Sequence, residues 1–376
     1  MRYLEDLEKI DWSALGDEEL ELPGLIRDYI ESKDGQALEF IWEEVFPDGD
    51  YLTEATSYVL EFFIPLLQEE GYRDEASIIR NLAQVCWAAM ESRNLYYNPD
   101  CDPAEWSFLS LLAVQEGFDA FIRIFSSRPD LRFPTAFILA CFPERASEYL
   151  PQILDLYGAT QTQFEKCELL LGLNQVAAHI PNWYEMLLVA VATEGAPVLQ
   201  HFAACFVVAH HGSDAPKHCF SILSKASPDE VPPYTSLITV ALPYTEVLGR
   251  ALRALPPQER IPILVSILPR VRKTTTAQSL VSYLMEAASM QPDLRVGREL
   301  GSGEFLPLNS AAVEPLRVDP SGPDWVQALV RCEPFWKDTI DLLSIFGLSP
   351  TRAGLIELWQ AVYAKPFPKL GIDSCA

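Results

Sequence analysis

The stretch Gly35–Leu67, GQALEFIWEEVFPDGDYLTEATSYVLEFFIPLL, holds two apolar helical blocks on either side of the acidic turn PDGDY. In the first block the apolar residues recur at helical spacing, which predicts a helix over 36–46 with one buried face. In the second block the polar positions lie three or four residues apart and form one narrow stripe, comprising Glu54, Ser57, Glu61, Pro65 and Gln68. A helix that is apolar on all other sides must be covered on both flanks, as an inner helix of stacked helix pairs is.

A proline inside the second block, Pro65, falls on this predicted polar stripe. Proline removes one backbone hydrogen bond and frees the carbonyl four residues earlier, which belongs to Glu61. That carbonyl can be hydrated on a solvent-facing stripe, so we expect the helix to tolerate a bend there.

Apolar residues at helical spacing recur along the chain, in segments joined by short connections that are rich in Pro, Gly, Asp or Ser. No segment alternates apolar and polar residues as a half-buried strand would. Helix pairs that repeat about every 35–45 residues are typical of an all-α solenoid. We therefore predict a helical repeat array over 1–290, an irregular Gly/Pro-rich loop over 291–322 and a helical cap of the same solenoid over 323–376.

Residues 22–67 resemble the opening of bacterial HEAT-repeat proteins. The resemblance begins in LPGLIRDYIESKDGQALEFIWEEVF, where a helix starts near a proline and a polar turn precedes an Ala- and Leu-rich helix. It continues in YLTEATSYVLEFFIPLL, where an aromatic residue and an Ala-Thr pair lead to an apolar Pro-Leu-Leu ending. The chain departs from the family pattern in the acidic DGD before Tyr51, where related sequences often carry His and Gln.

This resemblance implies a right-handed α-solenoid of HEAT-like antiparallel helix pairs that acts as a non-enzymatic binding platform without a cofactor. Some bacterial members of the family neutralise toxins as immunity proteins. Others are lyase or assembly partners of cofactor-bearing proteins. An inhibitor of a basic toxin and a scaffold or assembly factor are therefore the two roles that the resemblance offers for this chain.

The net charge is −25, and most of it lies at one end. Residues 1–75 carry 22 acidic and 5 basic side chains. Such a field attracts basic proteins and repels nucleic acid and anionic membranes, although acidic surfaces also serve solubility alone. We predict a basic protein partner for this end of the molecule.

The predicted partner-binding residues belong to this acidic end. The carboxylates are those next to the first helices and around the PDGDY turn, namely Glu18, Glu19, Glu21, Asp48, Asp50 and Glu54. Two aromatic residues, Trp42 and Tyr51, are candidate anchors because buried aromatic side chains dominate many interfaces. Trp42 also falls on the apolar face of its helix, where a core position is the simpler interpretation.

The eight cysteines form no C-x-x-C pair, and several lie in apolar segments that are predicted to be helical. They are interpreted as small buried hydrophobes of a reducing compartment, and the cytoplasm is the expected location. The first residues, MRYLEDLEKIDW, lack the apolar segment of a signal peptide, and no run of about 18 apolar residues predicts a membrane span.

All five histidines lie within 40 residues of one another, close to two cysteines; the set is His179, His201, His210, His211, His218, Cys205 and Cys219. His201 and Cys205 are four residues apart on one predicted helix, which is a spacing that a zinc site or a Cys/His nucleophile can use. No known ligand spacing is matched, so packed and helix-terminal histidines are the favoured interpretation, with no metal and no catalytic residue. A metal-dependent hydrolase stays an alternative.

The sequence has one concentration of basic residues, which comprises Arg250, Arg253, Arg260, Arg270, Arg272 and Lys273. Because HEAT-like DNA glycosylases hold DNA on a basic face, such an enzyme is a second alternative. With the chain at −25, we instead expect these cations to pair with acidic residues of neighbouring repeats or to make local contacts.

Overall fold

In the computed structural model the described residues are 4–15, 21–32, 35–47, 52–69, 71–90, 103–225, 244–288, 322–337, 343, 348–349 and 351–368. These residues form helices and turns and contain no strand. The prediction of an all-α protein is therefore confirmed for them. Residues 48–51 of the acidic turn and residues 291–321 of the predicted loop lie outside the described residues.

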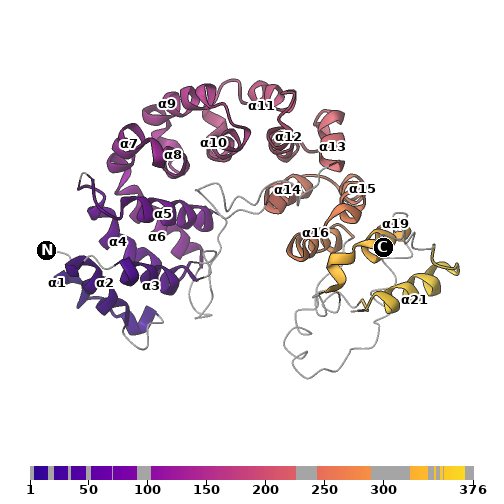
Figure 1. The fold of residues 1–376 in the computed structure, drawn as a ribbon, viewed down its shortest axis with the longest axis horizontal. Coiled ribbons are helices and arrows are strands. Elements are labelled where there is room, and N and C mark those ends of the chain that lie inside the picture. Colours follow the sequence, from indigo (N-terminus) through magenta and orange to yellow (C-terminus); the bar gives the residue numbers. More distant parts are fainter. Residues whose placement is uncertain are drawn as a thin grey trace, which may run out of the picture. The chain divides into compact units, whose positions relative to one another are not determined.

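The chain divides into two compact units, and the first comprises Met1–Trp183 with Tyr234–Leu242. Its α-helices, coloured indigo to magenta in Figure 1, are α1 (Leu4–Leu7), α2 (Glu21–Ser32), α3 (Gly35–Val45), α4 (Ala55–Leu66), α5 (Glu75–Met90), α6 (Pro103–Gln115), α7 (Phe118–Ser127), α8 (Arg132–Ala140), α9 (Ala146–Ala159) and α10 (Gln163–Gln175). Single 3-10 turns lie between some of them, at η1 (Trp12–Leu15), η3 (Pro129–Leu131), η4 (Pro143–Arg145) and η5 (Ala177–His179).

The second unit comprises Tyr184–Pro233 and Pro243–Ala376. Its α-helices are α11 (Trp183–Val191), whose first residue belongs to the other unit, α12 (Pro197–His211), α13 (Lys217–Ser224), α14 (Tyr244–Arg253), α15 (Pro257–Ile267), α16 (Thr274–Ala287), α19 (Gly322–Arg331) and α21 (Arg352–Tyr363). Its 3-10 turns are η6 (Gly212–Asp214), η8 (Leu268–Arg270) and η10 (Glu333–Lys337). Within the described residues of both units, no helix combines the length and the apolar character needed to cross a bilayer.

Helices of the first unit pack against neighbours on more than one side. Helix α8 contacts α5, α7 and α10, while α6 contacts α4 and α5. In α8 the seven consecutive residues 134–140 are buried, and in α10 the same holds for 167–173. Seven residues are two helical turns, so these segments are covered on every side and not along one stripe.

In the second unit, contacts connect alternate helices along the chain. Helix α12 contacts α14, and α14 contacts α16; in the same way α13 contacts α15, and α15 contacts α19. Consecutive helices also touch, since α12 packs on α13 and α15 on α16. Residues 202–208 of α12 are all buried. Two rows of helices that cover each other therefore make up this core.

The corner between α3 and α4 is fixed by two threonines of the TEAT segment. The hydroxyl of Thr56 donates to the carbonyl of Val45 over 2.7 Å, and the backbone N–H of Thr53 bonds the same carbonyl over 3.3 Å. Val45 is the last residue of α3, so its carbonyl has no partner inside the helix. The threonines satisfy it and hold the start of α4 against the end of α3.

The predicted polar stripe of α4 is correct only in part. Glu61 and Gln68 are exposed and Pro65 is half-buried, but Ser57 is buried at 8% exposure. Contacts with α3 and α6 cover α4 and leave its first turns little solvent access. The helix ends at Leu66, one residue after the proline, so Pro65 disturbs the last turn of α4 and not its centre.

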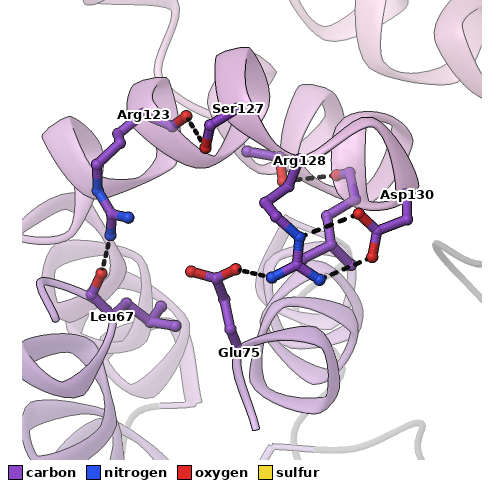
Figure 2. A network of polar contacts seen from close by, with 8 residues as sticks. Leu67, Glu75, Arg123, Ser127, Arg128 and Asp130 are labelled. Atoms are coloured by element: carbon purple, nitrogen blue, oxygen red, sulfur yellow. Dashed lines mark hydrogen bonds and ion pairs between the residues drawn. The ribbon is translucent and has the colours of Figure 1, made fainter. Parts of the chain in front are cut away.

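Two arginines, one on α7 and one directly after it, connect this helix to the end of α4 and the start of α5, as Figure 2 shows. The guanidinium of Arg123 donates to the carbonyl of Leu67, the C-cap of α4. Arg128 follows the last residue of α7 and pairs with Glu75, the first residue of α5, over 2.5 Å between Nη1 and Oε1. A cation at a helix carboxyl end and an anion at an amino end are both favoured by the helix dipole.

Arginines also donate to carbonyls near helix ends in the second unit. Arg270, at the end of η8, donates to the carbonyl of Ser224, the last residue of α13. Arg260 is buried and donates to the carbonyl of Leu255 over 3.1 Å. In both units an arginine thus satisfies the free carbonyls where an earlier helix ends.

Replacing Arg128 with methionine tests the ion pair between Arg128 and Glu75. The Glu75 side chain is only 2% exposed, so losing its partner leaves a buried carboxylate without compensation, and we expect a loss of about 2–4 kcal/mol in the free energy of unfolding. Asp130 also binds Arg128, but on the exposed side, so Asp130→Asn should cost less than about 1 kcal/mol. Urea denaturation of both variants measures the difference, and equal losses would contradict the proposed role of Glu75.

Candidate protein-binding surface

Helix α3 has one buried and one exposed face. Its buried residues are the apolar set Ala37, Leu38, Ile41, Trp42 and Val45. The exposed face carries Glu39, Phe40, Glu43 and Glu44. Phe40 is 44% exposed, which is unusual for so large an apolar side chain. We call these four residues the acidic α3 face: one aromatic ring among three carboxylates.

Carboxylates of α2 extend the negative charge next to this face. Helices α2 and α3 pack against each other, and α2 exposes Glu21, Asp28 and Glu31. Its one basic residue, Arg27, pairs with Glu8 over 3.3 Å. This cation is therefore already balanced by an acid from outside α2, and the carboxylates of α2 and α3 keep a negative excess.

The aromatic residues below the acidic α3 face hold the first helices together. The ring of Trp42 stacks on Phe63 of α4 at 5.3 Å between centroids, and Tyr29 of α2 meets Phe63 edge-on at 5.5 Å. The Tyr29 hydroxyl donates to Asp74 over 3.1 Å, which ties α2 to the residue before α5. Burial, together with hydrogen bonding to Tyr72, raises the pKa of Tyr29, so it stays a neutral hydroxyl.

The structure describes three of the residues predicted to bind a partner. Glu21 is exposed on α2 and Glu54 is half-buried just before α4. Trp42 is only 6% exposed and stacks in the core, because it falls on the apolar face of α3. The other predicted residues, Glu18, Glu19, Asp48, Asp50 and Tyr51, lie outside the described residues.

On α3, sequence reasoning missed the exposed aromatic residue Phe40. The signal was present, since the buried residues of α3 follow the spacing 37, 38, 41, 42 and 45, and residue 40 is out of that register. Phe40 lies between Glu39 and Glu43 in sequence, on the side that the predicted helix turns toward solvent.

The histidines and cysteines of the predicted cluster do not converge. Cys205 and Cys219 are buried, whereas His211 and His218 are exposed. His201 is hydrogen-bonded to the backbone of Pro197, on its own helix, and of Ile222 on α13. No group of three or more metal-ligating side chains is found among the described residues.

The predicted basic concentration is largely engaged inside the second unit. Arg253 and Arg260 both pair with Glu286 of α16, over 3.2 and 3.1 Å. Arg270 donates to backbone carbonyls at the ends of α13 and α15. The expected pairing with an acidic residue of a neighbouring helix is found for Arg253 and Arg260, whereas Arg270 makes local contacts with backbone carbonyls.

Comparison with protein-family models, with curated proteins and with solved structures found no match for this chain.

Two substitutions on α3 test which aromatic side chain is exposed. Trp42→Ala removes a stacked core side chain and should lower the free energy of unfolding by about 3–5 kcal/mol. Phe40→Ala should change it by less than about 1 kcal/mol, because Phe40 makes fewer contacts to lose. Urea denaturation measures both, and a larger loss for Phe40→Ala would show that α3 is turned the other way.

A pH-dependent difference in stability is expected for His201→Gln. Desolvation of the half-buried ring lowers the pKa of His201; backbone hydrogen bonds to Pro197 and Ile222 oppose this shift in part, and the charge of Arg270 adds to it. The folded protein therefore resists protonation at this site, and its stability falls as the pH drops through the unfolded pKa toward the lower folded one. Glutamine does not titrate, so the stability of the variant should improve relative to the wild type between pH 7.5 and 5.5. The denaturant midpoints of the wild type and the variant at both pH values measure this effect. A difference between the two proteins that is the same at both pH values would contradict the burial of His201.

Proposed function

We propose that this protein is a non-enzymatic binding protein whose acidic α3 face binds a basic protein. The observation that carries the proposal is the exposed ring of Phe40 among Glu39, Glu43 and Glu44. An aromatic side chain supplies a large contact area at low cost in conformational entropy, and carboxylates around it select a cationic surface.

The proposed scaffold is a right-handed α-solenoid built from HEAT-like antiparallel helix pairs. The contacts between alternate helices support it, since α12, α14 and α16 follow one another, as do α13, α15 and α19. In such a scaffold each pair is stabilised by its neighbours, and outward-facing side chains are free to bind other molecules. This arrangement would explain why large parts of α8, α10 and α12 are buried on all sides while α3 keeps one face exposed.

The charge of the first 75 residues sets the chemistry of the proposed partner. Their 22 acidic and 5 basic side chains produce a field that speeds association with a cationic surface. The field extends over a Debye length, which is about 10 Å at 0.1 M salt and about 3 Å at 1 M. Binding should therefore weaken strongly with salt, whereas an interface based on apolar burial alone would not.

Among the roles that the HEAT-like resemblance implies, we propose an immunity-type inhibitor of a basic bacterial toxin. A cationic enzyme that acts on nucleic acid or membranes needs its positive surface for its substrate. An acidic protein that covers this surface inhibits the enzyme by competing with that substrate. In this role the protein itself needs no catalytic residue and no cofactor.

Charge reversal on α3 tests the proposal. We expect Glu39→Lys with Glu43→Lys to reduce recovery of the partner from native cell extract at least about tenfold at low salt. The matched control is Glu185→Lys with Glu194→Lys, which makes the same charge change at two exposed positions of the second unit. Pull-downs at about 50 mM and about 500 mM salt, where the Debye length is roughly 14 Å and roughly 4 Å, separate the effect of the field from that of direct contact.

Three outcomes would overturn the proposal: the recovered protein is acidic, salt does not loosen it, or the control pair weakens recovery as much as the α3 pair does. If none of these outcomes is observed, adding this protein to an assay of the partner's own activity tests inhibition.

A further inference from the structure

Helix α6 exposes two large apolar residues and buries two serines. Phe108 is 64% exposed and Leu112 is 47% exposed. Ser107 and Ser110 are buried instead, and Ser110 has no exposure at all. At these four positions the helix departs from the pattern by which an amphipathic helix normally packs.

The buried side of α6 explains part of this orientation. Helix α6 contacts both α4 and α5. Small residues such as Ser110 and Ala113, together with Trp106 and Val114, form its buried side and allow close approach to these helices. The hydroxyl of Ser110 is buried without a hydrogen-bond partner among the described residues, which is unfavourable by about 1–3 kcal/mol.

The outward side of α6 forms a stripe with apolar residues in its centre and acids at its ends. Glu105, Phe108, Leu112 and Glu116 are spaced three, four and four residues apart, so they share one helical face. Glu105 and Glu116 are both exposed. We call these four residues the α6 stripe.

More acidic groups surround the carboxyl-terminal end of this stripe. Partial burial of Glu61, on the neighbouring helix α4, raises its pKa, and the charges of Glu116 and Asp6 raise it further, which places these three carboxylates near one another. The end of the stripe is therefore a site of mutual repulsion between carboxylates. A cation placed there would relieve that repulsion.

We propose that the α6 stripe is a second docking surface, which binds an amphipathic segment with apolar residues in its centre and Lys or Arg at its ends. Phe108 and Leu112 contact the apolar centre, and Glu105 and Glu116 pair with the flanking cations. A second copy of this chain fits poorly, because two stripes placed together would bring Glu105 and Glu116 against like charges. This surface goes beyond the acidic α3 face and does not rest on it.

The test uses a fluorescein-labelled peptide of about 18 residues, a length that spans a helix of about 27 Å. It consists of Leu and Lys, with Leu on one helical face at the centre and Lys at both ends. A control peptide has the same composition and charge but no apolar face. Fluorescence anisotropy compares their binding to the full chain, so that a difference between them reports on apolar contacts and not on charge alone.

The expected result is tighter binding of the amphipathic peptide, with a loss of about tenfold in Phe108→Ser with Leu112→Ser. Glu105→Gln with Glu116→Gln should weaken binding less and flatten its salt dependence. Val189→Ser is the matched control, since Val189 is 69% exposed but lies in the second unit, and it should bind as the wild type does.

Four results would overturn the proposal. Equal binding of the two peptides, or unchanged binding by the Phe108/Leu112 variant, would show that the stripe does not bind such a segment. A dimer in solution that this variant dissociates would assign the stripe to a second copy. A large drop in the variant's unfolding free energy, beyond about 2 kcal/mol, would show that the chain itself covers Phe108.

Discussion

The fold of this protein depends on helices that are covered by neighbours on all sides. Seven consecutive buried residues in each of α8, α10 and α12 leave no solvent-facing stripe over two helical turns. Such a helix cannot bury its surface against one partner, so it requires other helices on several flanks at once. Arginines such as Arg128 and Arg270 then satisfy the helix ends that this packing brings close to one another.

The same constraint indicates where function can reside. Side chains that cover a neighbouring helix are unavailable for binding, and no group of three or more metal-ligating side chains is found among the described residues. The faces that remain are those at which a large apolar side chain stays exposed. Among the described residues of the first unit these are α3, with Phe40 among carboxylates, and α6, with Phe108 and Leu112 between carboxylates. Both combine an apolar contact with negative charge, and this is why a cationic partner suits both.

Much of the helical architecture could be predicted from spacing, because apolar periodicity reports directly on burial. The helix predicted over 36–46 appears in the structure within a residue of each end, as α3. The orientation of individual side chains was harder to predict. In α6, serine is buried and phenylalanine exposed, which composition does not reveal because the helix is apolar on most sides. Phe40 was detectable in principle from its register, whereas the burial of Ser57 depends on neighbours that only the fold supplies.

The claim that the acidic α3 face binds the partner can be tested most directly by labelling carboxylates with a carbodiimide and an amine, with and without the captured partner. The account predicts that Glu39 and Glu43 lose labelling in the complex, while the exposed Glu185 and Glu194 of the second unit keep theirs. Protection of Glu185 and Glu194 with Glu39 and Glu43 still labelled would contradict it.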